Sequence, residues 1–280
     1  MDTSGMQTAW KCHECRTIQD YLQEAYGKQV IAGHARAFRG VSKRYGNLWP
    51  SIDRRDITDA GPVEVETDLL EEFLLRAWND LTPQERHRYL LAEARWGSKR
   101  NTAALVVARH RLVPTRCVDW SDCPLRALFF ACNGDHKCDG EVWWFNRSEF
   151  DRCVAAQWPA LFDKDGDVEA EIEQDFIFRR ESRWLTALNY MLLPDDRLDR
   201  QKGWITVAGH LGTCHAEEIQ RIGVCQKGRL VIPAGLKHEA IRLLEQLGIT
   251  KESLGLNHAN SADEIAREIK TEFDDKYDAK

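Results

Sequence analysis

Apolar residues recur at helical spacing in several stretches of the chain. The clearest stretch is residues 66–80, where Leu70, Phe73 and Ala77 fall on one face of a helix. Residues 82–85 (Thr-Pro-Gln-Glu) form a capping signature, which predicts that another helix begins there. The same spacing predicts helices at residues 17–26, 102–110, 125–132, 237–247 and 261–273.

Short runs rich in β-branched and aromatic residues predict strands between these helices. The strongest run is residues 141–145 (Glu-Val-Trp-Trp-Phe), which the turn signal Asp139-Gly140 introduces. The other predicted strands are residues 30–33, 35–40, 117–120, 203–207 and 228–233. Because neither an internal repeat nor a low-complexity linker interrupts this mixture, the pattern favours one α+β domain with a mixed or antiparallel sheet and helical decoration.

Three parts of the chain are expected from this pattern: an N-terminal helical segment (1–30), a central domain (31–256) and a polar C-terminal helix (257–280). The net charge of −6 argues against general binding to a phosphate backbone, although a local basic site remains compatible with it. No apolar run approaches the roughly 18–20 residues of a membrane span. The first residues also lack the features of a signal peptide.

Nine cysteines occur, an odd number, and they are scattered rather than paired. This usage favours free thiols in a reducing compartment, so we expect a cytoplasmic protein without membrane contact. Cys12 and Cys15 have the spacing of half a zinc knuckle, but the chain offers no second pair of this spacing. Free thiols are therefore the favoured interpretation, and no metal site is predicted.

The stretch with the most chemistry is residues 109–131, which reads RHRLVPTRCVDWSDCPLRALFFA. Arg109, His110, Arg116 and Asp119 lie within a dozen residues of one another, directly before a strongly apolar run. Charge held against an apolar element is unfavourable unless it is paired or used. We therefore expect the functional site here.

Several blocks in series resemble the FRG domain, a family named after its Phe-Arg-Gly tripeptide. The blocks are Phe38-Arg39-Gly40, Leu48-x-Pro50 with Arg54, His110, Pro114-Thr115-Arg116, Asp119-Trp120-Ser121, Pro124-Leu125, residues 127–131, Asp139-Gly140-x-Val142-Trp143, Arg197-x-x-x-Gln201-x-Gly203 and Ile232-Pro233 with Lys237. The likeness spans most of residues 31–256. Two departures stand out, because Arg111 and Leu112 replace the usual second His or aromatic residue and the usual Gly. The resemblance implies a bacterial or phage-associated protein in a defence-like context.

A weaker likeness to ADP-ribosyltransferases follows from the same blocks. It implies an ADP-ribosyltransferase-like sheet, NAD as the substrate, and a Phe-Arg-Gly arginine that holds a phosphate. On this basis Arg39, Gly40, Arg116, Trp120 and Ser121 are the predicted nucleotide-binding residues, and Asp119, His110 and Gln201 the predicted catalytic residues. A guanidinium can bind a diphosphate through paired hydrogen bonds. A carboxylate such as Asp119 can stabilise the positive charge that develops when a glycosidic bond breaks.

Each of these residues also has a purely structural interpretation. Asp119 can form a buried ion pair with Arg39 or Arg116, and Trp120 can fill the core. His110 can be a helix-end histidine, and Ser121 can cap the next helix.

Three functions therefore compete. The first is an NAD-using ADP-ribosyltransferase or NAD glycohydrolase that acts as a toxin or defence effector on a protein or nucleic-acid acceptor. The second is a non-catalytic module that binds a nucleotide or nucleic acid through Arg39, Arg109, Arg111 and Arg116. The third is an interaction protein whose charged cluster is structural. We favour the first, with Arg39, His110, Arg116, Asp119 and Gln201 converging on one site.

Overall fold

The structure is a computed structural model. It describes residues 9–27, 36–57, 60–83, 85–87, 90, 102–159, 185–188, 200–256, 261–277 and 279. The strand predicted at residues 30–33 and the predicted block residue Arg197 lie outside these ranges.

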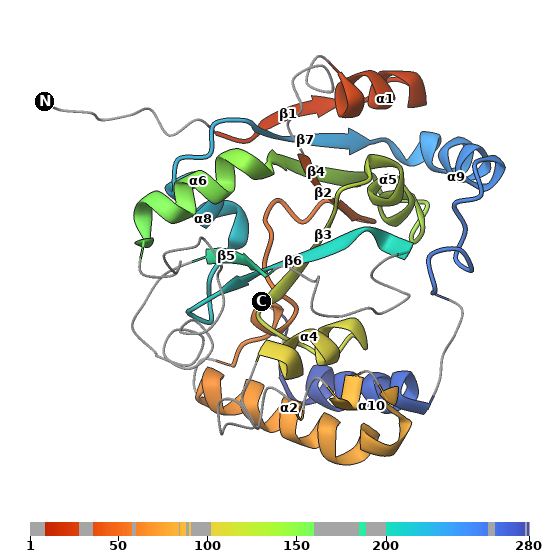
Figure 1. Ribbon diagram of the computed structural model, residues 1–280. Coiled ribbons are helices and arrows are strands. Elements are labelled where there is room, and N and C mark those ends of the chain that lie inside the picture. The colour runs from red at the N-terminus through yellow and green to blue at the C-terminus, as the bar shows by residue number, and fades with distance from the viewer. Residues whose placement is uncertain are drawn as a thin grey trace, which may run out of the picture.

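A seven-stranded sheet runs through the middle of the molecule in the order β1-β7-β4-β2-β3-β6-β5 (Figure 1). Its strands are β1 (Lys11–Glu14), β2 (Arg36–Val41), β3 (Cys117–Ser121), β4 (Gly140–Asn146), β5 (Leu185–Leu188), β6 (Gly203–Ala208) and β7 (Lys227–Ile232). The pair β1–β7 is parallel and the other pairs are antiparallel. The predicted α+β class with a mixed sheet is confirmed.

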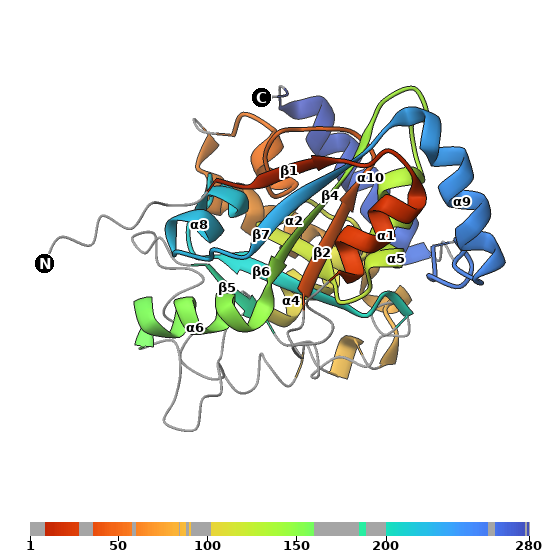
Figure 2. The same cartoon turned by 90° about the horizontal axis from the view of Figure 1, so that it is seen from above.

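Helices cover both faces of the sheet (Figures 1 and 2). The α-helices are α1 (Ile18–Tyr26), α2 (Pro62–Ala77), α4 (Thr102–His110), α5 (Pro124–Cys132), α6 (Arg147–Gln157), α8 (His215–Arg221), α9 (Lys237–Gln246) and α10 (Ser261–Lys276). Three 3₁₀ turns are η2 (Ile52–Arg54), η4 (Trp78–Asp80) and η8 (Ala234–Leu236). One apolar cluster joins α1, α5 and α9 to β2, β4 and β7, and a larger cluster joins the remaining helices to the sheet.

Local signals in the sequence place several helix ends correctly. The Thr17 hydroxyl accepts a hydrogen bond from the Asp20 amide at 3.0 Å and caps α1. The predicted capping box is also present, because Thr82 and Glu85 bond reciprocally to each other's backbone amides at 3.2 and 2.7 Å.

The N-terminal segment contains the predicted helix, as α1, and also a strand that was not predicted. Residues 11–14 form the edge strand β1, which pairs with β7 in parallel before α1 begins. The short polar run Lys-Cys-His-Glu carries no alternation of apolar residues, so its pairing depends on β7 rather than on a local signal. Cys12 is exposed on this strand, whereas Cys15 is buried beyond it.

The polar C-terminal helix α10 packs lengthwise against α2 (Figure 1). Ala262, Ala266, Ile269 and Phe273 are its buried residues, and their spacing gives it one apolar face. On its polar side, Arg76 of α2 forms ion pairs with two glutamates of α10. The helix therefore belongs to the packed structure that carries the site.

The glycine of the Phe-Arg-Gly tripeptide is required by helix packing. A Cβ atom on Gly40 would lie 1.9 Å from the Ala127 carbonyl oxygen and 2.7 Å from the Ala131 amide nitrogen of α5. Gly40 was predicted to bind the nucleotide, but the space beside its Cα is filled by the backbone of α5. Phe38 occupies the same cluster as α5, whereas Arg39, one residue on, faces the opposite side of the sheet.

Replacing Gly40 by Ala is expected to lower the free energy of unfolding by about 1–3 kcal/mol or more, because helix backbone cannot move aside as a flexible side chain can. Urea denaturation measures this loss. Gly235→Ala is the control, since a Cβ there would meet nothing within 4 Å. Equal stability of the two variants would contradict the packing role of Gly40.

Candidate functional site

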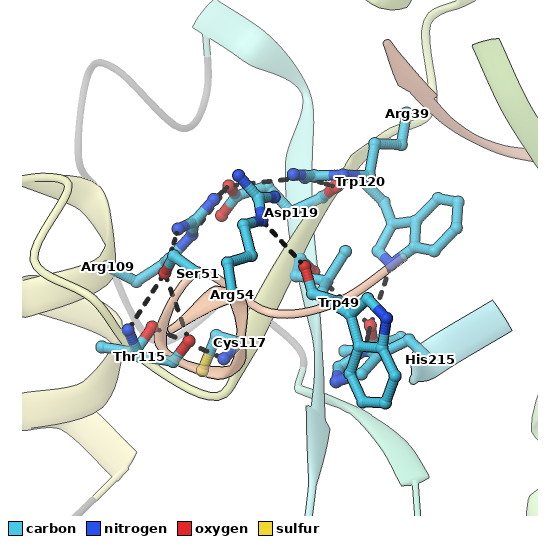
Figure 3. A network of polar contacts seen from close by, with 12 residues as sticks. Arg39, Trp49, Ser51, Arg54, Arg109, Thr115, Cys117, Asp119, Trp120 and His215 are labelled. Carbon is cyan, nitrogen blue, oxygen red and sulfur yellow. Dashed lines mark hydrogen bonds and ion pairs between the residues drawn. The ribbon is translucent and has the colours of Figure 1, made fainter. Parts of the chain in front are cut away.

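The sheet opens between its two central strands. β2 pairs with β4 along its whole length, but in the described part of the sheet it pairs with β3 only at Phe38 and Ser121. Beyond that pair the Arg39 side chain links the two strands, because its Nη1 donates to the Asp119 backbone carbonyl at 2.7 Å. The Phe-Arg-Gly tripeptide and the Asp119 block, 80 residues apart, therefore meet at this opening (Figure 3).

The Asp119 carboxylate is bound mainly by Arg109, at the end of α4. Arg109 Nε donates to Oδ2 at 2.9 Å, Nη2 of the same guanidinium contacts that oxygen too, and Arg39 Nη1 lies 3.7 Å away. Burial would raise the pKa of Asp119, but Arg109 and then Arg39 outweigh this effect and hold the pKa at about 2. Asp119 is therefore ionised at neutral pH, and 40% of its side chain is exposed.

A third guanidinium, Arg54, lies beside the same carboxylate (Figure 3). Its Nε donates to the Trp49 carbonyl at 3.3 Å, and its guanidinium lies 5.7 Å from the ring centre of Tyr45. Ser51, in the same segment, accepts a hydrogen bond from Arg109 Nη1 at 3.0 Å and from the Thr115 amide at 3.1 Å. These hydrogen bonds hold the loop after β2 against the segment that leads into β3.

Positive charge exceeds negative charge in this arrangement. Burial, opposed by Asp119 and reinforced by the charges of Arg109 and Arg54, lowers the pKa of Arg39 to about 9. Desolvation and the charge of Arg109 likewise lower the pKa of Arg54. Three guanidinium groups repel one another around one carboxylate, so an anion bound here would relieve the repulsion. We call Arg39, Arg54, Arg109 and Asp119 the arginine cluster.

Arg116 does not join the arginine cluster. Its Nε donates to Glu66 Oε2 at 2.6 Å, its Nη1 donates to the Gly209 carbonyl at 3.1 Å, and both members of the Arg116–Glu66 pair are 1% exposed. Of the two partners expected for Asp119, Arg39 lies beside it, whereas Arg116 does not, because Glu66 of α2 supplies Arg116 with a buried carboxylate. Arg111 is similarly paired, with Glu85 and Asp263.

The remaining predicted residues lie around the cluster rather than in it. Trp120 is buried, stacks against Trp204 and contacts the edge of the Phe145 ring, as its structural interpretation requires. Ser121 donates to the Gln201 carbonyl at 2.7 Å and accepts from the Cys123 amide at 3.1 Å just before α5. The Gln201 side chain itself donates to the Leu254 carbonyl at 3.1 Å.

His110 is buried at the C-terminal end of α4, one residue after Arg109. A positive charge on its imidazole would lower the pKa of Asp119, so His110 lies within electrostatic range of that carboxylate. Of the five residues expected to converge, the structure thus brings Arg39, His110 and Asp119 together and keeps Arg116 and the Gln201 side chain apart from them.

Leu112 explains one departure from the FRG pattern. It follows α4 with a φ of 70°, a left-handed conformation that favours glycine, and its side chain is exposed. The usual glycine at this position thus fits a backbone requirement of the turn, which this chain meets with a leucine.

Behind the opening, a buried chain of hydrogen bonds ends at His215 (Figure 3). The Trp120 indole donates to the Thr206 hydroxyl at 2.9 Å, and that hydroxyl lies 2.7 Å from His215 Nδ1. The Thr206 hydroxyl also lies within donating distance of the Val118 carbonyl, so the direction of its hydrogen bond with Nδ1 depends on the tautomer of the imidazole. Burial and then the charge of Arg39 lower the pKa of His215 to about 3, so the ring is neutral at physiological pH.

This burial predicts a pH-dependent stability. Below the unfolded pKa of about 6.5 the unfolded chain binds a proton at His215 and the folded chain does not. The free energy of unfolding should therefore fall by about 1.4 kcal/mol more between pH 7.5 and 5.5 than it does in His215→Gln. Denaturant titrations at the two pH values measure this, and equal falls in both proteins would contradict the assignment.

Within the described residues, no group of three or more His, Cys, Asp or Glu side chains is arranged to hold a metal ion. None of the described helices has the length and apolar character needed to cross a bilayer.

Comparison with known proteins identifies one family. The FRG domain family matches residues 34–140, a range that contains the whole arginine cluster and ends before Gln201. No curated protein and no solved structure matches the chain. The chain therefore contains a region, residues 34–140, that matches the FRG domain family.

Proposed function

We propose that the arginine cluster binds the diphosphate of a nucleotide, and that NAD is this nucleotide. The observation that supports the proposal is the excess of guanidinium groups: Arg39, Arg54 and Arg109 surround one carboxylate at the point where the sheet opens. Guanidinium groups bind phosphate oxygens through directed, charge-assisted hydrogen bonds. A diphosphate would offset the mutual repulsion that lowers the pKa values of Arg39 and Arg54.

The reaction that suits this ligand is cleavage of the bond between nicotinamide and ribose, in an ADP-ribosyltransferase-like sheet. Positive charge develops on the ribose as that bond breaks, and the ionised, partly exposed Asp119 carboxylate would stabilise it. His110, next to this carboxylate, is the proposed proton acceptor for an incoming protein, nucleic-acid or water nucleophile. The Gln201 side chain donates to the Leu254 carbonyl, and its proposed role is to position that loop. We further propose a toxin or defence role for this activity.

A non-catalytic nucleotide-binding module is the second candidate. Arg109 forms two contacts with Asp119, so much of the carboxylate's charge is already neutralised before any substrate binds. This pairing favours tight anion binding over efficient stabilisation of a cation. A long nucleic acid is a poorer ligand, because a phosphate backbone needs cations along a path and Arg111 and Arg116 are both paired with carboxylates.

Replacing Asp119 by Asn separates the two candidates. Removing a negative charge from the arginine cluster should strengthen binding of pyrophosphate about tenfold, as charge repulsion at this range predicts. In an NAD-cleaving enzyme the same variant should lose most nicotinamide release. Calorimetry with pyrophosphate and chromatography of nicotinamide measure the two effects. Weaker pyrophosphate binding by Asp119→Asn would contradict the anion site, and unchanged nicotinamide release would contradict the catalytic role of Asp119.

A further inference from the structure

The Ser51 hydroxyl lies where the loop after β2 meets the end of α4 and the segment that leads into β3 (Figure 3). Its Oγ accepts hydrogen bonds from Arg109 Nη1 at 3.0 Å and from the Thr115 amide at 3.1 Å. It also donates to the Thr115 carbonyl at 3.3 Å. A hydroxyl has one proton and two lone pairs, so these three bonds use its whole capacity. Ser51 can therefore influence a ligand only through a neighbouring residue.

The Thr115 backbone fixes the position of this hydroxyl. Thr115 is completely buried, and its carbonyl also accepts from the Ile52 amide at 3.4 Å. The half-buried Ser51 and the buried Ile52 are thus both bonded to one residue of the core. The hydroxyl therefore accepts from Arg109 at a fixed point.

Arg109 is held from two sides. Its Nε and Nη2 contact Asp119 Oδ2, whereas its Nη1 donates to Ser51. A guanidinium carries its donors in a rigid, planar fork, so bonds on two sides set both its position and the direction of its plane. Only 9% of the Arg109 side chain is exposed, whereas Arg54, beside the same carboxylate, is exposed.

We propose that Ser51 is a positioning residue that holds Arg109 against Asp119. In this arrangement Arg39 and Arg54 bind the phosphates of the nucleotide, and Arg109 neutralises the carboxylate that would otherwise repel them. This inference rests on the proposed function and assigns different roles to the three guanidinium groups of the arginine cluster. Arg54 is the group that a ligand reaches from solvent, and Arg39 lies at the opening of the sheet.

Nuclear magnetic resonance of the full chain with isotope-labelled arginine tests the positioning. In the native chain, Arg109 Nη1 and Nη2 should give separate signals, because bonds at both groups hinder rotation of the guanidinium. In Ser51→Ala the Arg109 Nε proton should exchange with water roughly tenfold faster, as the loss of one hydrogen bond to a charged group predicts. Ser51→Thr keeps the hydroxyl and should restore slow exchange. Arg109→Lys identifies the signals by their loss.

Ser253→Ala is the matched control. The Ser253 hydroxyl accepts from the Thr250 amide at 2.9 Å and donates to the Thr250 carbonyl at 3.1 Å, so it makes the same pair of backbone bonds as Ser51. No guanidinium contact of Ser253 is present among the described residues. This variant should leave the exchange of the Arg109 Nε proton unchanged.

Two results would overturn the positioning role of Ser51. One is a single averaged Nη signal for Arg109 in the native chain. The other is equal exchange of its Nε proton in the native chain and Ser51→Ala. The first measurement needs no variant, so it decides the question even if Ser51→Ala fails to fold.

Inorganic pyrophosphate, added to the native chain in calorimetry and in the same resonance experiment, tests the other half of the inference. It should shift the Nε signals of Arg39 and Arg54 more than that of Arg109, and a larger shift at Arg109 would overturn the division of roles. Absence of pyrophosphate binding would overturn the proposed function. The signals of Arg109 would then still decide whether Ser51 positions it.

Discussion

Replacing Glu66 by Gln is expected to lower the free energy of unfolding by about 3–5 kcal/mol, because it leaves the Arg116 guanidinium buried without its counter-charge. Glu66 accepts from the Arg116 amide at 2.8 Å as well as from the side chain, and the pair links α2 to the segment that leads into β3. Loss of the pair therefore weakens the attachment of α2 to the segment that leads into β3.

Glu72→Gln is the matched control for this experiment. Glu72 lies on the same helix and pairs with Arg76 one turn away, but its side chain is 43% exposed. Exposed pairs of this kind contribute about 0.3–0.5 kcal/mol. Urea denaturation of the two variants should thus differ by several kcal/mol, and a loss at Glu66 as small as that at Glu72 would show that the buried pair does not support the fold.

Replacing Arg39 by Ala is expected to weaken NAD binding by about 1.5–3 kcal/mol, or roughly 10- to 150-fold, the contribution of a hydrogen bond to a charged group. Arg39 also bridges the opening between β2 and β3 through the Asp119 carbonyl. The variant should therefore lose some stability as well, and thermal unfolding without ligand measures that part separately. Arg54→Ala should weaken binding similarly without the structural loss, because Arg54 is exposed on a 3₁₀ turn.

The sequence predicts where the strands and helices lie better than it predicts which of them pair or pack together. The strands around residues 38, 119, 143, 205 and 230 follow from β-branched and aromatic runs, and the meeting of Arg39 with Asp119 follows from the two motif blocks. The edge strand β1 does not, because its pairing with β7 is set by a contact more than two hundred residues away. Short helices such as α6 and α8 are likewise fixed by tertiary packing rather than by a clear apolar stripe.

The partner of Asp119 shows the same limit. Arg109, Arg111 and Arg116 all lie within ten residues of it, and spacing alone does not tell which of them turns toward the strand. The course of the backbone determines which arginine reaches Asp119. Helix α4 ends at His110, and Leu112 then adopts a left-handed conformation. After this turn, Arg116 pairs with the buried Glu66. Arg54 belongs to the first motif block, but only the three-dimensional structure places it beside Asp119.

The most direct test of the account is a calorimetric titration of the native chain, Arg39→Ala and the exposed control Arg242→Ala with NAD. The arginine cluster predicts that the native chain and Arg242→Ala bind NAD with equal affinity, and that Arg39→Ala binds it at least tenfold more weakly. Absence of binding by the native chain, or equal affinity in all three proteins, would contradict nucleotide binding at this site.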